Sequence, residues 1–440
     1  MEDIKKLVSK YVKASFDYEL YLEITNRQLI EVSDEKLENL VKAKEAGLGV
    51  RVLKDSRMGF AYTTDLKEDA IKDCVEKAME ICELTPPDEG FSFNCQKPEG
   101  HFSCLYDEDA ISIPAEDKVD MVVSLEKKAK SLDNRIKGVR KVSLSEKHLE
   151  AYCYNSCGLE YYCKSTFYRS LISALAEEKG DASISYDYRA SRRLKELDLD
   201  GMVKDVVFKA TSLLHPEPYE TKVVPVILFR DVSASLLEAF GSIFLGEALL
   251  KDRTPLKGKV GESVCSDEIS IIDDGTLSGG YMSFPFDAEG IKTKRNVLVD
   301  RGVLRGFLHS LYTAKKLKTE PTGNSLRESF KSLPVCGITN LYIDKKDAKL
   351  EDLIGYYEEV FLVLDLMGLH TVDPVSGDFS LGASGIIYKR GQKEKSVRGV
   401  TISGNVLELW KSVVKVGSDL TFYGNVGSPS LLIEKLTVGG

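Results

Sequence analysis

Two prolines placed two residues apart interrupt this chain close to its midpoint. They lie in His215-Pro216-Glu217-Pro218, and this spacing can continue neither a helix nor a central strand. The chain has 440 residues, which is too long for one ordinary hydrophobic core and favours about two or three domains. We therefore predict one domain of residues 1–217 and a second of residues 218–440, with His215 in the linker between them.

The hydrophobic periodicity predicts runs of strands with a few separate helices in both halves. Helical spacing covers residues 2–15, 65–84, 114–132, 200–214 and 406–414. Segments that predict strands cover residues 18–25, 48–62, 140–188, 223–229, 269–272, 295–299, 303–308, 341–343, 360–366, 385–388, 397–402 and 430–436. Such segregation is typical of α+β folds. We predict an N-terminal α/β layer domain with antiparallel strands and a strand-rich C-terminal domain that carries a central helix.

Charge and hydropathy argue against several classes of protein. The net charge is −9 and the pI is near 5.4, which is unlike the basic surface that binds a nucleic acid backbone. No apolar run approaches the roughly 20 residues that a membrane-spanning helix needs. The first residues, MEDIKKLVSKYVK, have the spacing of an amphipathic helix rather than of a signal peptide. We expect a cytoplasmic protein that binds neither nucleic acid nor membrane.

Nine cysteines are scattered along the chain, and three of them cluster in LEAYCYNSCGLEYYCKSTFY. Alternating residues on both sides of Asn155-Ser156-Cys157-Gly158 predict a hairpin, with Cys153 and Cys163 on its strands and Cys157 in its turn. This arrangement favours a hairpin over a metal site. We expect the cysteines to be reduced and buried, which is the usual state in a cytosolic protein.

Residues 231–254, DVSASLLEAFGSIFLGEALLKDRT, predict one long helix at the start of the second half. Asp231 or Ser233 can cap its first turn. One apolar stripe at helical spacing is formed by Leu236, Phe240, Ile243 and Phe244. Glu238 interrupts the apolar run, and a carboxylate among apolar side chains is costly unless it is paired. Position 238 lies half a turn from Phe240, so periodicity alone puts Glu238 on the solvent face, and a catalytic role is the alternative.

The words Leu-Glu-Ala-Phe-Gly-Ser at residues 237–242 resemble the zinc helix of the TldD/PmbA metalloprotease family. In the catalytic branch of that family the helix reads His-Glu-Ala-Phe-Gly-His, where the histidines hold zinc and the glutamate activates water. This chain has Leu237 and Ser242 at the histidine positions, and neither is a credible zinc ligand. The catalytic branch takes a third ligand from a cysteine before its last strand. Here the last cysteine is Cys336, and Tyr-Gly-Asn-Val-Gly at 423–427 fills that stretch. The resemblance therefore points to the PmbA branch, also called TldE, which lacks the zinc ligands.

Further short motifs resemble those of the family and occur in the same order as in the family. They are found at residues 286–290, 302–304, 322–324, 429–433 and 437–440, and the first half adds the Asn-Ser-x-Gly turn at 155–158.

The segment LHTVDPVSGDFS, residues 369–380, resembles a signature of the PmbA branch. His370, Asp373 and Asp378 could ligate a divalent ion or bind a peptide end. The alternative is a structural loop in which Asp373-Pro374 starts a turn and Ser376-Gly377-Asp378 continues it. Both interpretations stay open at this point.

The resemblance implies a subunit of a cytoplasmic zinc metalloprotease complex that degrades or processes unfolded peptides. We expect no metal in this chain, a vestigial role for Glu238, and zinc in a TldD-like partner chain of a heterodimer or larger assembly. An extended peptide could pair with an exposed strand edge. Two alternatives remain. The first is an active metallopeptidase that uses Glu238 with a metal at His370, Asp373 and Asp378. The second is a free-standing peptide-binding homodimer.

Overall fold

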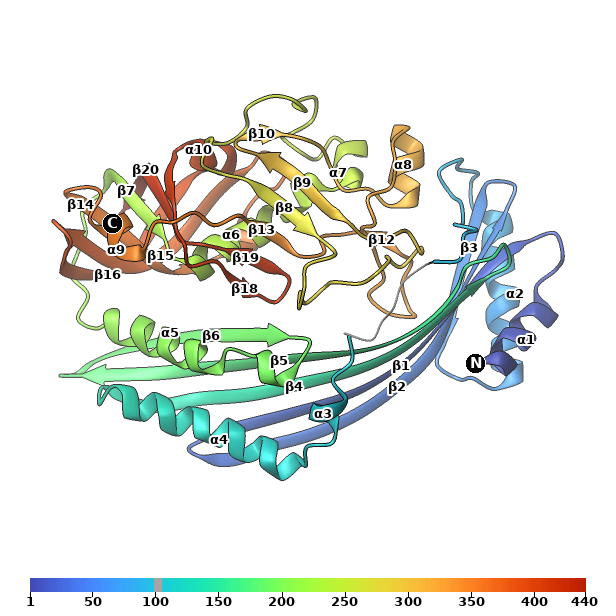
Figure 1. Cartoon of the computed structure of the whole chain (residues 1–440), viewed down its shortest axis with the longest axis horizontal. Coiled ribbons are helices and arrows are strands. Elements are labelled where there is room, and N and C mark those ends of the chain that lie inside the picture. Colours follow the sequence, from blue (N-terminus) through green and yellow to red (C-terminus); the bar gives the residue numbers. More distant parts are fainter. Residues whose placement is uncertain (99–104) are drawn as a thin grey trace.

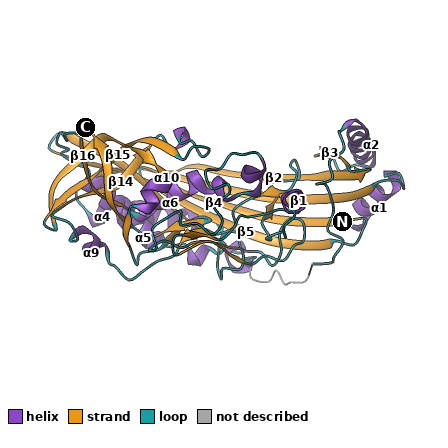
Figure 2. Ribbon diagram, turned by 90° about the horizontal axis from the view of Figure 1, so that it is seen from above, coloured by secondary structure: helices purple, strands orange, loops and turns teal. Residues whose placement is uncertain are grey.

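The computed structural model describes residues 1–98 and 105–440. Its first half is built on one six-stranded antiparallel sheet with the order β3-β2-β1-β4-β5-β6. Figure 1 shows these long strands curving beneath the second half, and Figure 2 shows them from above. The strands are β1 (Asp17–Ser33), β2 (Lys36–Lys54), β3 (Arg57–Thr63), β4 (Ile136–Asn155), β5 (Glu160–Glu178) and β6 (Asp181–Ser191).

Helices cover one face of this sheet and leave the other face to the second half. Along β1, Leu20 and Leu22 point to the helical face, whereas Glu19 and Tyr21 point the other way because side chains alternate along a strand. The covering helices are α1 (Glu2–Tyr11), α2 (Glu68–Leu84), α4 (Ala115–Leu132) and α5 (Leu199–Ser212), with the short α3 (Glu108–Ile111) and η1 (Leu194–Glu196) nearby. No helix within the described residues is long and apolar enough to cross a membrane.

The second half contains two larger sheets around one continuous core. In one sheet, pairing of β16 with both β15 and β20 closes the strands into a barrel. Its strands are β7 (Lys222–Leu228), β14 (Glu359–Met367), β15 (Asp378–Lys389), β16 (Gln392–Asn405), β17 (Val413–Val416) and β20 (Leu431–Gly439). The other sheet contains β8 (Ile271–Asp274), β9 (Arg295–Asp300), β10 (Val303–Leu304), β13 (Leu341–Ile343), β18 (Thr421–Tyr423) and β19 (Val426–Ser428).

Shorter elements connect these sheets. They are the strand pair β11 (Ser325–Leu326) and β12 (Val335–Cys336), the helices α6 (Arg230–Phe240), α7 (Gly246–Leu250), α8 (Leu311–Leu317), α9 (Leu350–Ile354) and α10 (Val406–Lys411), and the 3₁₀ turns η2 (Gly241–Phe244) and η3 (Leu369–Thr371). Helix α6 packs against β14 of the barrel and against β13, β18 and β19 of the other sheet. The predicted α+β class is confirmed.

The prediction of one continuous helix over residues 231–254 is wrong. The α-helix ends at Phe240, continues as the 3₁₀ turn η2, and then opens into an extended residue, Leu245. Leu245 forms a bridge with Leu308, whose backbone N–H and C=O bond to Phe244 and Gly246. Pairing with a distant segment therefore replaces helical hydrogen bonds that periodicity alone would continue.

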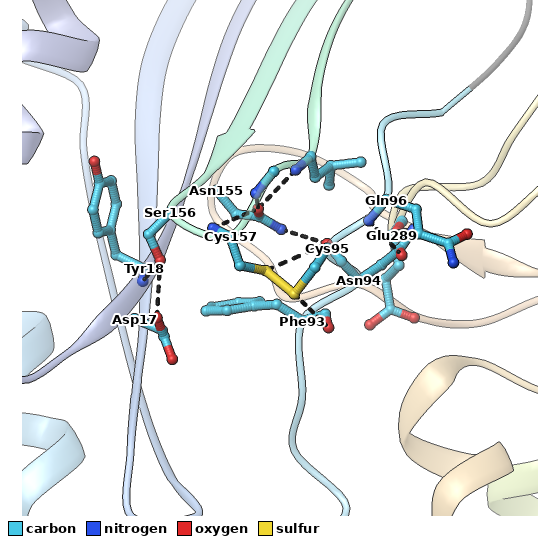
Figure 3. Close-up of a disulfide and its surroundings, with 12 residues drawn as sticks. Asp17, Tyr18, Phe93, Asn94, Cys95, Gln96, Asn155, Ser156, Cys157 and Glu289 are labelled. Carbon is cyan, nitrogen blue, oxygen red and sulfur yellow. Dashed lines mark hydrogen bonds between the residues drawn. A yellow bond between two sulfur atoms is a disulfide. The ribbon is translucent and has the colours of Figure 1, made fainter.

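The expectation that all cysteines are reduced is wrong for two of them. Cys95 and Cys157 form a disulfide, which Figure 3 shows beside the turn that joins β4 to β5. Asn155 aligns the two segments, because its Nδ2 donates to the Asn94 carbonyl (2.8 Å) and its Oδ1 accepts from the N–H of Gly158 (2.9 Å). The two cysteines are 62 residues apart in sequence, so local patterns do not reveal their proximity. The other described cysteines are buried free thiols.

The linker is tied to both halves. Pro216 forms a bridge with Ser396 of β16, and the Glu217 N–H donates to the same residue. His215 has a φ of 53°, and its Nε2 lies 2.9 Å from the Glu178 carboxylate at the end of β5. The first sheet uses residues before 192 and the others use residues after 221; the domain boundary at 217/218 itself stays a prediction.

Candidate functional site

Helix α6 holds the residues that resemble a zinc helix, and they differ sharply in exposure. Leu237 is completely buried in the core of the second half, whereas Glu238 and Ser242 are exposed. In a straight helix positions 237 and 242 would lie about 140° apart. The α-helix becomes the 3₁₀ turn η2 at Gly241, whose N–H donates to the Glu238 carbonyl. The backbone between positions 237 and 242 is therefore not a straight α-helix.

Glu238 lies on the side of α6 that faces the first sheet. Its electrostatic neighbours are Arg169 on β5 and Tyr188 on β6. Partial desolvation raises the pKa of the Glu238 carboxyl, and the positive charge of Arg169 opposes that shift. Burial, with a smaller contribution from the Glu238 charge, raises the pKa of Tyr188 to about 12. Glu238 therefore faces the space between the two halves.

The Tyr423–Gly427 stretch lies against the same helix. The Ser428 hydroxyl is 2.7 Å from the Ser233 hydroxyl of α6. Asn425 donates to the Ile338 carbonyl (3.4 Å) and accepts from the Leu341 N–H (2.9 Å). A Cβ added at Gly241 would have the Leu341 and Ile338 side chains as its nearest neighbours, at 3.3 and 3.5 Å. The segment that would carry a third ligand in a catalytic relative thus lies beside the end of α6 and the turn η2, which hold positions 237 and 242.

The residues at this position do not fit zinc. Leu237 has no donor atom, Ser242 offers a single hydroxyl, and residues 423–427 contain neither cysteine nor histidine. A catalytic zinc is held by three protein ligands drawn from His, Cys, Asp and Glu. Within residues 1–98 and 105–440, no group of three such side chains could hold a metal ion.

The loop at 369–380 is closed by its own hydrogen bonds. The Asp373 carboxylate accepts from the Val375 N–H (2.9 Å), which holds the pKa of Asp373 below its ordinary value. The Asp378 carboxylate accepts from the Asn405 amide (2.9 Å), and His370 is exposed in η3. Both carboxylates are therefore occupied by neighbouring protein donors, as in an Asx turn.

A cavity of about 450 Å³ between the two halves is a feature that the sequence does not predict. We call it the seam cavity. Its floor is the helix-free face of the first sheet, and its roof consists of loops and the short strand β11 of the second half. The floor contributes Tyr21, Glu23, Arg27, Ser145, Lys147, Leu149, Ala151, Tyr161, Cys163, Phe167 and Arg169, and the roof contributes Tyr281, Met282, Phe284, Phe286, Asp287, Ala288, Thr293, Ser325, Leu326, Arg327, Glu328 and Thr339.

One signal of this cavity is present in the sequence. Tyr161, Cys163, Phe167 and Arg169 alternate along β5, so they share one face of the strand. Such a face mixes aromatic and charged side chains where a core strand would be uniformly apolar. Their roof partners come from distant loops, which a single strand pattern cannot identify.

Buried ion pairs fix the end of the seam cavity. Glu19 of β1 binds Arg51 of β2 (2.8 Å) and Arg327 of the second half (2.5 Å), and Arg51 lies 3.8 Å from Glu289. Burial raises the pKa of Glu19, but the two arginines outweigh it and hold that pKa below its ordinary value. Burial, followed by the charge of Glu289, raises the pKa of Asp287 to about 7. Breaking one member of such a network leaves uncompensated buried charge.

An aromatic side chain completes this contact. A Cβ at Gly47 of β2 would lie 2.1 Å from the Phe330 ring, and one at Gly49 would lie 2.5 Å from the Phe330 carbonyl. The two glycines therefore leave room for Phe330 on the sheet.

Family models match three successive parts of the chain. The PmbA/TldA metallopeptidase domain 1 matches residues 18–82, the central domain matches residues 108–214, and the C-terminal domain matches residues 221–440. The chain belongs to the PmbA/TldD metallopeptidase family. The family membership predicted from residues 237–242 and from the motifs that follow them is thereby confirmed.

Members of the PmbA/TldD family in bacteria and archaea are similar over nearly the whole chain. Metalloprotease PmbA of Escherichia coli O157:H7 is 28% identical over 413 residues, which cover 92% of this chain and 88% of that protein. A metalloprotease of Archaeoglobus fulgidus is 28% identical over 431 residues, covering 93% and 96%. The crystal structure of TldE from Thermococcus kodakarensis has a TM-score of 0.88 at 25% identity and full coverage of both chains. A Thermotoga maritima protein described as a putative modulator of a DNA gyrase has a TM-score of 0.89 at 26% identity, again with full coverage.

Proposed function

We propose that this chain is the PmbA/TldE-like, non-catalytic subunit of a cytoplasmic zinc metalloprotease complex. A TldD-like chain with the intact His-Glu-Ala-Phe-Gly-His helix would hold the zinc. The complex would cleave unfolded or extended peptides, and this chain would form part of the chamber that admits them. Glu238 would then be a vestige of the catalytic helix.

The observation that carries this proposal is the composition of the turn at the end of α6. Leu237 is buried there, Ser242 is exposed, and the neighbouring stretch at 423–427 supplies no sulfur or imidazole. A site with an apolar residue in place of a ligand cannot be restored by a small movement, since the donor atoms themselves are missing. The names of the relatives, which include both PmbA and TldD proteins, support a related pair.

The proposal is tested by expressing this chain together with a TldD-like chain from the same organism. We expect the two chains to co-elute in size-exclusion chromatography and the pair to cleave an unfolded, carboxymethylated protein in a chelator-sensitive way. We expect this chain alone to hold no stoichiometric zinc by elemental analysis and to show no cleavage. About one tightly held zinc per chain, or chelator-inhibited turnover by the isolated chain, would contradict the proposal.

Two alternatives predict other outcomes of the same experiment. A peptidase with its own metal at His370, Asp373 and Asp378 predicts that the isolated chain is active and loses activity when Asp373 is replaced. A free-standing peptide-binding homodimer predicts a stable dimer of this chain that the TldD-like chain does not displace.

A further inference from the structure

Three cationic side chains, Arg27, Lys147 and Arg169, line the floor of the seam cavity. Arg27 of β1 and Lys147 of β4 are direct cross-strand partners. Arg169 of β5 lies opposite Ser145, two residues along β4 from Lys147. Strand alternation puts all three on the face that lines the cavity. Within the part of the chain that the structure describes, none of the three forms a salt bridge.

Lys147 is the most constrained of these cations because it is only partly exposed. Burial lowers the pKa of its ammonium group. The charge of Glu23 opposes that shift, the charge of Arg27 adds to it, and the charges of Glu328 and Glu45 oppose it. Glu23 already accepts from the Thr25 hydroxyl (2.9 Å), and Glu328 is exposed. An ammonium that loses water without gaining a paired carboxylate is destabilised. A ligand carboxylate beside Lys147 would supply the missing partner.

The walls around this cation are aromatic. Phe167 is the cross-strand partner of Lys147, and its ring lies 5.3 Å from the Tyr281 ring of the roof. Further along, the Tyr161 and Phe286 rings are 5.0 Å apart. The cavity volume of about 450 Å³ falls within the range of roughly 300–1,000 Å³ that is usual for ligand pockets. The lining thus combines aromatic side chains with the three cations of the floor, and it also includes the carboxylates of Glu23, Asp287 and Glu328.

We propose that the seam cavity binds the carboxyl-terminal end of an extended peptide whose last residue is apolar or aromatic. Lys147 donates to the terminal carboxylate, Arg27 and Arg169 add positive charge on either side, and the last side chain packs among the aromatic walls. That the ligand is a peptide rests on the proposed function; that it is an apolar carboxylate rests on the cavity alone. This chain would then select peptides by their free end while the partner cleaves them.

Calorimetric titration of the full-length isolated chain tests this proposal with a matched pair of probes. The probes are acetyl-Ala-Leu-Phe with a free carboxylate and the same peptide with a terminal amide. We expect the acid to bind at least about 10-fold more tightly than the amide, which corresponds to about 1.4 kcal/mol. Lys147→Met should remove this preference while still binding the amide, and Lys147→Arg should retain it. Lys164→Met removes the same charge from the opposite face of β5 and should change nothing.

Three results would overturn the proposal. They are equal binding of acid and amide, no binding by a correctly folded chain, and an unchanged acid preference in Lys147→Met. Acetylphenylalanine alone is a further probe, since binding as tight as that of the tripeptide acid would make the ligand a small carboxylate rather than a peptide. The titration uses the isolated chain, so its outcome does not depend on complex formation. If the chain binds acid and amide equally but still forms a complex with the TldD-like chain, only the present inference is contradicted. If the chain prefers the acid but forms no complex, only the proposed function is contradicted.

Discussion

Leu237 separates this chain from a zinc-binding relative most clearly. Its side chain is completely buried in the apolar core around α6, so it contributes to folding where a ligand would contribute to catalysis. Glu238 beside it is exposed and carries a raised pKa through partial desolvation. Leu237 offers no donor atom to a metal, whereas Glu238 keeps a carboxylate at the next position of the same helix.

Asp273 of β8 makes a pH-dependent contribution to stability. Its carboxylate accepts from the Thr339 N–H (2.7 Å) and from the Asn324 amide (2.7 Å), and burial raises its pKa from an ordinary value of 3.8 to about 6. The folded state therefore binds this proton more tightly than the unfolded state, so folding gains stability as the pH falls from about 7 to about 4. Asp273→Asn removes that gain. We expect the stability deficit of the variant to grow by about 1 kcal/mol between pH 7 and pH 5, measured by urea unfolding.

Asp344→Asn is the matched control for this prediction, because Asp344 follows β13 and is exposed. Its stability difference from the wild type should be the same at both pH values. A deficit of Asp273→Asn that stays constant or shrinks as the pH falls would show that Asp273 is ionised in the folded protein at both values.

Helices and strands differ in how well the sequence predicts them. The helix predicted at 65–84 is α2, Glu68–Leu84, because Ile71, Cys74, Val75 and Ala78 bury one regular stripe. Strands β1 and β2 extend beyond the predicted segments. Residues 36–45 of β2 are exposed on both faces, so they lack the alternation from which a strand is predicted, and pairing with β1 holds them extended. The break of α6 escapes prediction for a similar reason, since the competing partner, Leu308, is distant in sequence.

The disulfide connects the segment before residue 98 to the β4–β5 turn, and we expect it to stabilise the first half. It closes a loop with a sequence separation of 62 residues, and cross-links of such loops typically contribute about 2–4 kcal/mol. Replacing Cys95 and Cys157 together by alanine should lower the Tm in a thermal scan without reductant. Dithiothreitol should lower the Tm of the wild type toward that of the double variant and leave the double variant unchanged. A wild-type Tm that is insensitive to the reductant would contradict this assignment.

The turn after α6 should accept a rebuilt metal site if the 423–427 stretch lies where the structure puts it. Leu237→His with Ser242→His supplies two ligands, and Asn425→Cys adds a third from beside Ile338 and Gly241. We expect the double variant to bind zinc weakly and the triple variant to bind it at least about 10-fold more tightly, since a third protein ligand completes the usual catalytic set. Zinc affinity is measured by competition with a chromogenic chelator, after folding is checked by circular dichroism.

The control for the rebuilt site replaces Asn425→Cys by Ser376→Cys, which adds a thiol on the exposed 369–380 loop. This combination should bind zinc no better than the double variant. Equal affinities of all three proteins would mean that residue 425 does not reach the turn at Gly241.

The two halves of the molecule meet face to face, and the seam cavity lies between them. Figure 1 shows the second half lying over the concave side of the long sheet. The Glu19, Arg51 and Arg327 pairs and the Phe330 contact at Gly47 hold that arrangement. The sequence predicts the family and the missing ligands, because both can be identified from short sequence motifs. It does not predict the seam cavity, since the lining comes from strands and loops that only the folded chain brings together.

We propose that this chain assists catalysis in a complex without performing it. The most direct measurement compares two glutamate variants in the reconstituted complex with a TldD-like chain. We expect Glu238→Gln in this chain to leave the rate of peptide cleavage within about twofold of the wild type. The same change in the His-Glu-Ala-Phe-Gly-His helix of the partner should lower the rate by about 100-fold or more, as expected for loss of a general base. Loss of cleavage with Glu238→Gln, together with retained cleavage by the partner variant, would mean that Glu238 of this chain is the catalytic base.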